Sequence, residues 1–489
     1  MPHIMEEFKL SEKTISVKDS AVETRGVDMV PENERNSKAT NVFYVLCGSQ
    51  FAFGIMMMGA LPIIFGLGWW SAFWAITIGL AIGSAVIGPM SILSQRTGTN
   101  GAASSGAFFG VKGRAIGSIL NIVISIGFYA LMVWTGAQAF AAGGHRLFGW
   151  SEGTGTILIG CVIISLVTAT VAIIGHKLVV LFEKIGTWFV GTIVILSIFT
   201  FATQFDVNYT GGQYILGSFG PTWLLALLVA ASIPISYAPF VGDYARYVPY
   251  RNSSIKLAVS TSLGMFVGCF LSMVPAAYLM STVTDLTVPF VSGVLAGAPS
   301  WWVIPLMLAG IFGSIPNGSL CLYSAGLSLE ALGLKVKRVI TTLIMTIVGL
   351  ILVFYGVNDV NNMISLIDAF VIIIIVGVSP WLTINLIGHY LVKGQYKPLE
   401  LHFINSTSSY WYTSGYNIPA VLAWVVGLII GLMFTSTTIF AGPLVAVVGG
   451  IDLSFTSSAI VGGLLYWVLL KVFPNSTAVS QDATGNITS

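Results

Sequence analysis

The stretch SIPISYAPFVGDYARYVP (232–249) forms the end of a long apolar run. The run is apolar enough to cross a membrane, yet it contains Pro234 and Pro239. It then finishes on Asp243 and Arg246. Proline lacks a backbone donor and clashes with the preceding turn, so two prolines this close together should break a helix. In lipid, a broken helix is tolerated only where protein or water covers the freed backbone groups. The stretch therefore predicts a discontinuous membrane span.

The composition of the whole chain is that of a membrane protein. Of its 489 residues, 55% are hydrophobic and only 8% are charged, whereas about a quarter of the residues in soluble domains are charged. A soluble core of this size would have too few charges to cover its surface. The formal net charge of +2 gives no reason to expect a nucleic acid as a partner. We therefore expect an all-α membrane protein surrounded by lipid.

Apolar runs recur along the chain, and each is long enough to cross a bilayer core of about 30 Å. We expect twelve spans, at 42–66, 70–94, 115–142, 155–175, 178–204, 221–243, 254–280, 300–331, 338–357, 362–390, 417–438 and 441–472. The polar segment 1–41 shows no signal-peptide pattern. It should be a cytoplasmic, partly disordered tail.

The placement of charge supports this count. If the N-terminus is cytoplasmic, every Lys and Arg except Arg146 falls in an inner segment or at the inner end of a helix. The outer loops instead hold the acids Glu152, Asp206, Asp285 and Asp359. This is the positive-inside asymmetry. It predicts that both tails, 1–41 and 473–489, face the cytoplasm from the plasma membrane.

Other titratable and sulfur-containing residues suggest no metal or redox centre. The cysteines lie in apolar spans without paired spacing and should be small buried hydrophobic residues: Cys47, Cys161, Cys269 and Cys321. Three acids lie near predicted helix ends, where we expect them to be solvated: Glu183, Glu330 and Asp452.

Two spans in equivalent positions are interrupted by Gly or Pro. Span 1 reads CGSQFAFGIMMMGALPIIFG (47–66), and span 6 contains the two prolines of the opening stretch. Span 1 and span 6 hold equivalent positions if residues 42–204 and 221–390 form two five-helix repeats, followed by two further helices in 417–472. Such a pair points to a transporter site at the repeat interface, where half-helix ends can bind a substrate and a cation. The alternative is two ordinary proline kinks.

Four motifs occur in a characteristic order: VETRGVDMVPENER (22–35), FFGVKGRAIGSILN (108–121), GDYARYVP (242–249) and SPW (379–381). Together they make the chain resemble the purine/cytosine permeases, the first nucleobase–cation symporter family, from about residue 22 to 440. The resemblance implies a leucine-transporter-like fold of five plus five inverted helices plus two. It also implies alternating access and symport of cytosine, a purine, uracil, allantoin or a hydantoin-like compound with Na⁺ or H⁺, without another cofactor.

By motif position, the resemblance implies a substrate site built from spans 1, 3, 6 and 8. A flat heterocycle needs an aromatic face and a few polar groups at its edge. The candidates are Gln50, Ala52, Phe53, Phe128, Met132, Pro234, Ser236, Tyr237 and Asn317. Relatives tend to have a polar group where Met132 stands, and Met132 cannot hydrogen-bond strongly. We expect span 6 to be unwound from Pro234 to Tyr237.

In span 8, Asn317 can both donate to and accept from a nucleobase edge, and we expect Pro316 to disrupt the helix beside it. The alternative for Asn317 is a hydrogen bond between helices.

The resemblance also implies a sodium site, in which the backbone carbonyls of Gly48 and Phe51 join the hydroxyl of Ser314, since a hard cation prefers oxygen. Only one hydroxyl is evident, so proton coupling stays open. Asp368 is then the intramembrane acid that could carry the proton, unless it reaches the outer surface or bonds to a neighbouring helix. Asp243 and Arg246, three residues apart on one helical face, should be structural or gating groups at the cytoplasmic interface.

Two rival functions stay open, one from another class and one from the same class. A membrane-embedded enzyme would need a metal cluster, a nucleophile with its base, or paired acids, and the sequence shows none. An amine or amino-acid symporter on the same fold is the nearer alternative. The uncharged set Gln50, Ser236 and Asn317 favours a neutral ring over a zwitterion. The sequence leaves the oligomeric state open.

Overall fold

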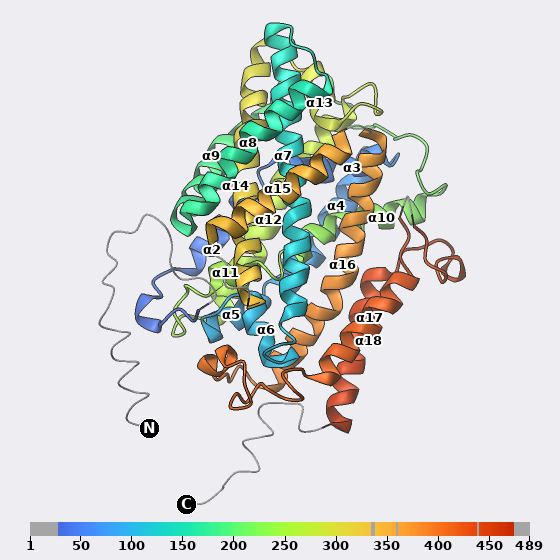
Figure 1. Cartoon of the computed structure of the whole chain (residues 1–489). Helices are drawn as coiled ribbons and strands as arrows, with labels where there is room; N and C mark the ends of the chain where they lie inside the picture. The colour runs from blue at the N-terminus through green and yellow to red at the C-terminus, as the bar shows by residue number, and fades with distance from the viewer. Residues whose placement is uncertain (1–27, 334–337, 358–359, 438–439, 474–489) are drawn as a thin grey trace, which may run out of the picture.

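A bundle of helices makes up the computed structural model, which describes residues 28–333, 338–357, 360–437 and 440–473 (Figure 1). The described part has no named strand, only two isolated bridges. The elements are η1 (Glu32–Glu34), α2 (Ala39–Gly48), α3 (Phe53–Ile64), α4 (Trp69–Ile87), α5 (Met90–Thr97), α6 (Gly101–Phe109), α7 (Ala115–Phe148), α8 (Thr154–Ile174), α9 (His176–Thr200), α10 (Phe219–Ser236), α11 (Val241–Ala245), α12 (Ser254–Ser281), α13 (Phe290–Gly297), α14 (Ser300–Ala331), α15 (Arg338–Val357), α16 (Val360–Leu391), η2 (Pro398–His402), α17 (Ile418–Met433), η3 (Ala446–Val448) and α18 (Ser454–Val472).

Each predicted span has a helical counterpart. Ten spans of the described chain are long and apolar enough to cross a membrane, and the bent pair of α2 and α3 makes an eleventh. The helix α17, with 16 residues, stands at the remaining position. The expected all-α membrane fold is confirmed, whereas the division into inverted repeats at 42–204 and 221–390 stays a prediction.

Several predicted boundaries were wrong. The last span was expected to begin at residue 441, but α18 begins at Ser454. Gly449 and Gly450 there adopt φ values of 72° and 82°, which are incompatible with a continuing helix. The short helices α6 and α13 were not expected.

The interruption of span 1 is present and sharp. The helix α2 ends at Gly48, α3 begins at Phe53, and the two halves are bent by 64°. Span 6 differs from the prediction, because α10 continues through Pro234 to Ser236 and the interruption follows at residues 237–240. Turns closed by hydrogen bonds between residues three apart bridge this interruption. For example, the N–H of Tyr237 donates to the carbonyl of Pro234 at 3.1 Å. The backbone groups are therefore paired again without a strong bend.

Span 8 is not disrupted at all. The helix α14 runs unbroken from Ser300 to Ala331 with Pro305 and Pro316 inside it, so the expected disruption at Pro316 is wrong. The neighbouring helix α9 makes room for the proline ring, because it presents Gly186 there. A Cβ placed on Gly186 would lie 3.2 Å from the ring of Pro316.

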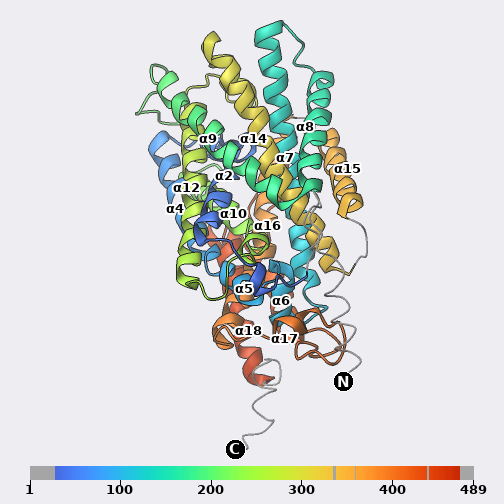
Figure 2. The ribbon, with the colours of Figure 1, turned by 90° about the vertical axis from the view of Figure 1, so that its left-hand side faces the viewer.

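Close helix packing organises the bundle. The helix α14 packs along α7 and α9, α4 packs along α10, and α17 packs along α18. Figures 1 and 2 show α17 and α18 together at one end of the molecule. Between α4 and α10 the backbones nearly touch. A Cβ on Gly79 would overlap the carbonyl of Leu227, and one on Gly83 would lie 2.5 Å from the carbonyl of Ala231. Small residues four apart commonly permit such an approach in membranes.

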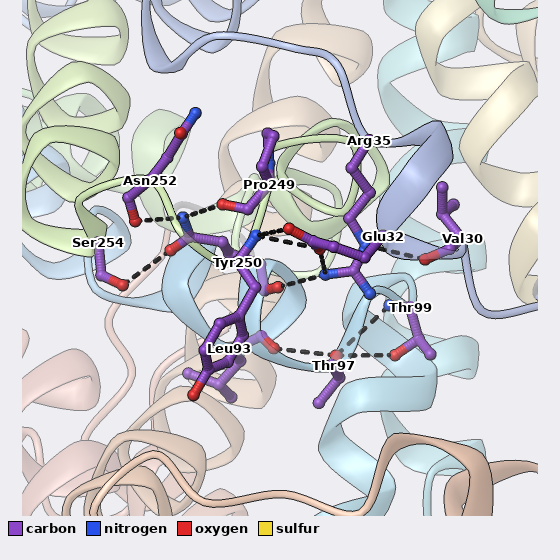
Figure 3. A network of polar contacts seen from close by, with 11 residues as sticks. Val30, Glu32, Arg35, Leu93, Thr97, Thr99, Pro249, Tyr250, Asn252 and Ser254 are labelled. Carbon is purple, nitrogen blue, oxygen red and sulfur yellow. Dashed lines mark hydrogen bonds and ion pairs between the residues drawn. The ribbon is translucent and has the colours of Figure 1, made fainter.

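The described end of the N-terminal tail is not loose but bound to the bundle (Figure 3). The N–H of Val30 donates to the carbonyl of Gly98 at 2.9 Å. The guanidinium of Arg35 donates to the carbonyls of Val30 at 2.8 Å and Gln95 at 2.9 Å. A carboxylate oxygen of Glu32 accepts from the N–H of Tyr250 at 2.9 Å. These bonds fix the entry to α2 against the end of α5 and the turn before α12.

We expect Gly83→Ala to destabilise the protein, because the added methyl group must separate two backbones that are in contact. Overpacking of this kind costs about 1–3 kcal/mol. Thermal unfolding in detergent would measure the loss. The matched control is Gly155→Ala on α8, where nothing lies within 4 Å of an added Cβ and the change should be neutral or slightly stabilising. An equal response of both variants would contradict the packing described for α4 and α10.

Candidate substrate and cation site

The amide of Asn317 connects the two interrupted spans. Its Nδ2 donates to the carbonyl of Ser49, in the break of span 1, at 2.6 Å. It also donates to the hydroxyl of Tyr237, at the break of span 6, at 2.8 Å. Its Oδ1 lies 3.6 Å from the sulfur of Cys321. All these side chains are buried. The amide thus makes interhelical hydrogen bonds at the point where the predicted site residues of spans 1, 6 and 8 meet.

The other predicted polar groups bond close to their own backbone. The Nε2 of Gln50 donates to the hydroxyl of Ser49 at 2.7 Å and to the carbonyl of Leu46 at 3.1 Å, and its Oε1 accepts from the thiol of Cys269 on α12 at 3.4 Å. The hydroxyl of Ser236 donates to the carbonyl of Ile233 at 2.8 Å. Both side chains therefore have partners within the protein.

The two predicted stacking rings, Phe53 and Phe128, pack against different helices. Phe53 packs against α14, where a Cβ on Gly310 would lie 3.0 Å from its ring, and it meets Phe290 edge-on at 6.4 Å between centroids. Phe128 meets Phe370 of α16 edge-on at 6.2 Å.

The apolar candidates fill the space around the breaks. Met132 reaches the junction of α3, α7 and α14, since a Cβ on Gly54 would overlap its terminal methyl group. Ala52, fully buried, precedes α3 in extended conformation. The ring of Pro234 faces α4, where a Cβ on Gly83 would lie 3.2 Å from it.

The predicted cation ligands are only partly brought together. The carbonyl of Phe51 faces Gly313 of α14, whose Cβ would lie 2.7 Å away. The hydroxyl of the next residue, Ser314, instead faces Gly136 of α7 and donates to the carbonyl of Ile311 at 2.7 Å. The side chain of Asp368 lies outside the described residues.

Comparison with known proteins decides the family. A family model described as permease for cytosine/purines, uracil, thiamine, allantoin matches residues 29–462. The chain belongs to the purine/cytosine permease family. The resemblance expected from the four motifs is therefore confirmed. Because permeases carry solutes across membranes, membership decides for transport over a membrane-embedded enzyme.

Individual relatives of this permease are distant. YxlA of Bacillus subtilis, provisionally named a purine-cytosine permease, is 28% identical over 92% of this chain and 96% of its own. The purine-cytosine permease FCY22 of Saccharomyces cerevisiae is 23% identical over 66% of this chain and 63% of its own.

Two solved structures share the fold. Mhp1, a nucleobase-cation-symport-1 family transporter solved in a closed conformation with bromovinylhydantoin, superposes with a TM-score of 0.74 at 16% identity, over 95% of this chain and all of that one. A Na⁺-coupled sialic acid symporter gives 0.55 at 12% identity, over 89% and 91%. The expected leucine-transporter-like fold is thereby confirmed.

The charged pair of the permease is enclosed within the protein. Asp243 and Arg246 are both 0% exposed. Asp243 accepts a hydrogen bond from the hydroxyl of Ser324, and Arg246 lies 3.4 Å from the hydroxyl of Tyr323, both on α14. The short helices α5 and α6 pack against α11 and cover this end of span 6, and a structural or gating role for the pair stays a prediction.

Two of the three acids expected in solvent are buried as well. Asp452 is 2% exposed and accepts from the N–H groups of Ser436 at 2.5 Å and Ser454 at 2.8 Å, so it fixes the start of α18. Glu183, in α9, is 0% exposed. In the sequence, Gly186 and Thr187 follow Glu183 by three and four residues. This spacing places the three on one face of the helix, and two small residues on that face are a signal that could have suggested burial. The cysteines are free and buried, as predicted.

We expect Asn317→Ala and Tyr237→Phe to be coupled in stability. The first change removes the donor for both Ser49 and Tyr237 and should cost about 1–3 kcal/mol. The second removes one acceptor only and should cost about 1 kcal/mol. Thermal unfolding of both variants and the double variant forms a double-mutant cycle. Strictly additive losses would show that the Asn317–Tyr237 bond contributes nothing.

Proposed function

We propose that this permease takes up a small neutral nitrogen heterocycle by cation-coupled symport across the plasma membrane, with both termini in the cytoplasm. Cytosine, purines, uracil, allantoin and hydantoins are the candidate substrates. The family description names the first four classes or members, and Mhp1 was solved with a hydantoin. The observation that carries the proposal is the uncharged pair of Asn317 and Tyr237, which hydrogen-bond to each other where both interrupted spans meet.

Recognition of the ring would use groups that already pair with each other. The amide of Asn317 and the hydroxyl of Tyr237 can each donate and accept, so a heterocycle edge could replace their mutual bond without leaving a polar group unpaired. Phe53 or Phe128 would provide the stacking face. The other candidates, Gln50, Ala52, Met132, Pro234 and Ser236, would shape the surrounding pocket.

Na⁺ is the coupling ion that we propose. The sialic acid symporter with this fold is Na⁺-coupled, and the break of span 1 offers the carbonyls of Gly48 and Phe51. Ser314 would complete the set only if its side chain, which faces Gly136 of α7, turned toward the break. Proton coupling through Asp368 is the competing hypothesis.

A thermal-shift screen of the purified permease tests the substrate class. Nucleobases, allantoin, hydantoins and small amines should be compared with and without Na⁺, followed by uptake into proteoliposomes. Stabilisation by a neutral heterocycle, strengthened by Na⁺, is expected. Stabilisation by amines alone would contradict the proposal.

Phe128→Ala should weaken substrate binding about tenfold to a hundredfold. Stacking of a base on an aromatic ring contributes roughly 1–3 kcal/mol, and about 1.4 kcal/mol corresponds to a factor of ten. Ligand titration by thermal shift would measure this, with Phe199→Ala as control because Phe199 is 72% exposed on α9. Unchanged affinity in both Phe128→Ala and Phe53→Ala would place the pocket elsewhere.

Ser314→Ala should reduce the stimulation of substrate binding by Na⁺ while leaving binding without Na⁺ nearly intact. The reason is linkage: if Na⁺ strengthens substrate binding, loss of a Na⁺ ligand weakens that effect. Ser281→Ala, at the end of α12, is the matched control. Uptake that ignores Na⁺ but collapses with a protonophore, together with a neutral Ser314→Ala, would contradict Na⁺ coupling. Asp368→Asn should in that case abolish uphill uptake but permit exchange.

A further inference from the structure

The inward face of α9 places a carboxylate inside the bundle. Val190 on this face lies near Gly313, since a Cβ there would be 3.5 Å from it, and Gly186 faces Pro316, both on α14. One turn earlier, Glu183 lies beside α2, because a Cβ on Gly48 would lie 2.5 Å from the Glu183 carbonyl. The side chain of Glu183 is 0% exposed. The carboxylate is therefore inside the bundle, on the turn of α9 whose backbone lies beside the end of α2.

This carboxylate has no hydrogen-bond partner on either oxygen among the described residues. The groups that interact with it electrostatically include Cys47, Tyr237 and Cys321, and none of these side chains carries a positive charge. Lys184, the next residue, lies on the exposed side of α9. A buried carboxylate without compensation is strongly unfavourable, so the position calls for either a proton or a bound cation.

The end of α2 also favours a cation beside Glu183. The helix α2 ends at Gly48, and the C-terminus of a helix carries partial negative charge. A carboxylate beside it is repelled unless a cation lies between them. The hydroxyl of Thr187 on the same face of α9 is also at Gly48, because a Cβ there would overlap it. Carboxylate, hydroxyl and carbonyl oxygens are the ligands that a hard cation prefers.

The donor set favours a monovalent ion. The described residues contain no group of three or more His, Cys, Asp or Glu that could hold a metal. A single carboxylate with neutral oxygens leaves no excess negative charge once one monovalent cation is bound. A divalent ion would instead leave one positive charge uncompensated in an apolar interior, which is costly.

We propose that Glu183, Thr187 and the C-terminal end of α2 form a Na⁺ site. It lies toward the predicted cytoplasmic end of α9, seven residues before Val190, which corresponds to about 10 Å of helix. It shares the end of α2 at Gly48 with the proposed site of Phe51 and Ser314 but lies at another level of α9, and it would be a second station for the ion on its way inward. This inference rests on the proposed cation coupling for its role in transport, but binding of Na⁺ there can be measured without substrate.

The test uses the full-length permease in detergent, with Na⁺ titrated against choline at constant ionic strength and without substrate. Thermal stability and binding of radioactive sodium are measured for wild type, Glu183→Gln and the control Glu152→Gln, whose side chain is exposed. Wild type and the control should show saturable stabilisation by Na⁺. Glu183→Gln should weaken the apparent Na⁺ affinity by about tenfold or more, a loss of about 1.4 kcal/mol or more.

A second pair keeps the test independent of the folding of Glu183→Gln. Thr187→Val removes the hydroxyl at nearly constant volume and should weaken Na⁺ binding, whereas Thr187→Ser retains the hydroxyl and should not. A wild-type response to Na⁺ in Glu183→Gln, or no response to Na⁺ in wild type, overturns the proposal.

Ser314→Ala separates this inference from the proposed function. Loss of the Na⁺ response in Glu183→Gln but not in Ser314→Ala supports the Glu183 site and contradicts the Ser314 site. The reverse result overturns the Glu183 site and leaves the proposed function intact.

Discussion

In the interior of a membrane, every backbone group freed by a broken helix must find a partner within the protein. The break of span 1 between Gly48 and Phe53 creates such groups, and the protein satisfies them locally and from α14. The N–H of Phe51 donates to the carbonyl of Gly48 at 3.1 Å. The carbonyl of Ser49 accepts from Asn317. Because that second bond comes from another helix, α14 must remain straight and close to the break.

The sequence of α14 is arranged for this approach. Gly310 lies beside the ring of Phe53, Gly313 beside the carbonyl of Phe51, and Asn317 bonds to Ser49. Spacings of three and four residues place all three on one face of the helix. Two glycines let the chain of α3 come close, and one amide compensates its polar backbone. The same face therefore supports the break structurally and presents the polar group that we assign to the substrate.

Polar and charged side chains gather around the same region because the ends of the spans are covered. Asp243 and Arg246 are enclosed where α5 and α6 pack on α11, and the bound segment from Val30 to Arg35 fixes the entry to α2. Glu183, on α9, is buried beside the end of α2. Buried groups of this kind are unfavourable unless they serve as ligand sites or hold neighbouring elements in place. Asp243 and Arg246 bond to α14 and so hold neighbouring elements in place, whereas Glu183 is the group that we assign to an ion.

The sequence by itself determined the membrane class, the break of span 1 and the family, and it predicted a span wherever the structure has a long apolar helix, since these depend on local composition and motifs. It also singled out Asn317, because an amide within an apolar run is conspicuous. It misplaced the break of span 6, because a helix can retain Pro234 when the neighbouring turns pair its carbonyls. It predicted a disruption at Pro316 that α14 does not have, since a membrane helix can retain a proline where neighbouring groups satisfy the freed carbonyl. Only the tertiary structure decided which acids are buried, since exposure at a helix end depends on which distant elements cover it. For Glu183 the covering surfaces are α2 and α14, each more than a hundred residues away from it in the chain, and no local pattern specifies those two partners.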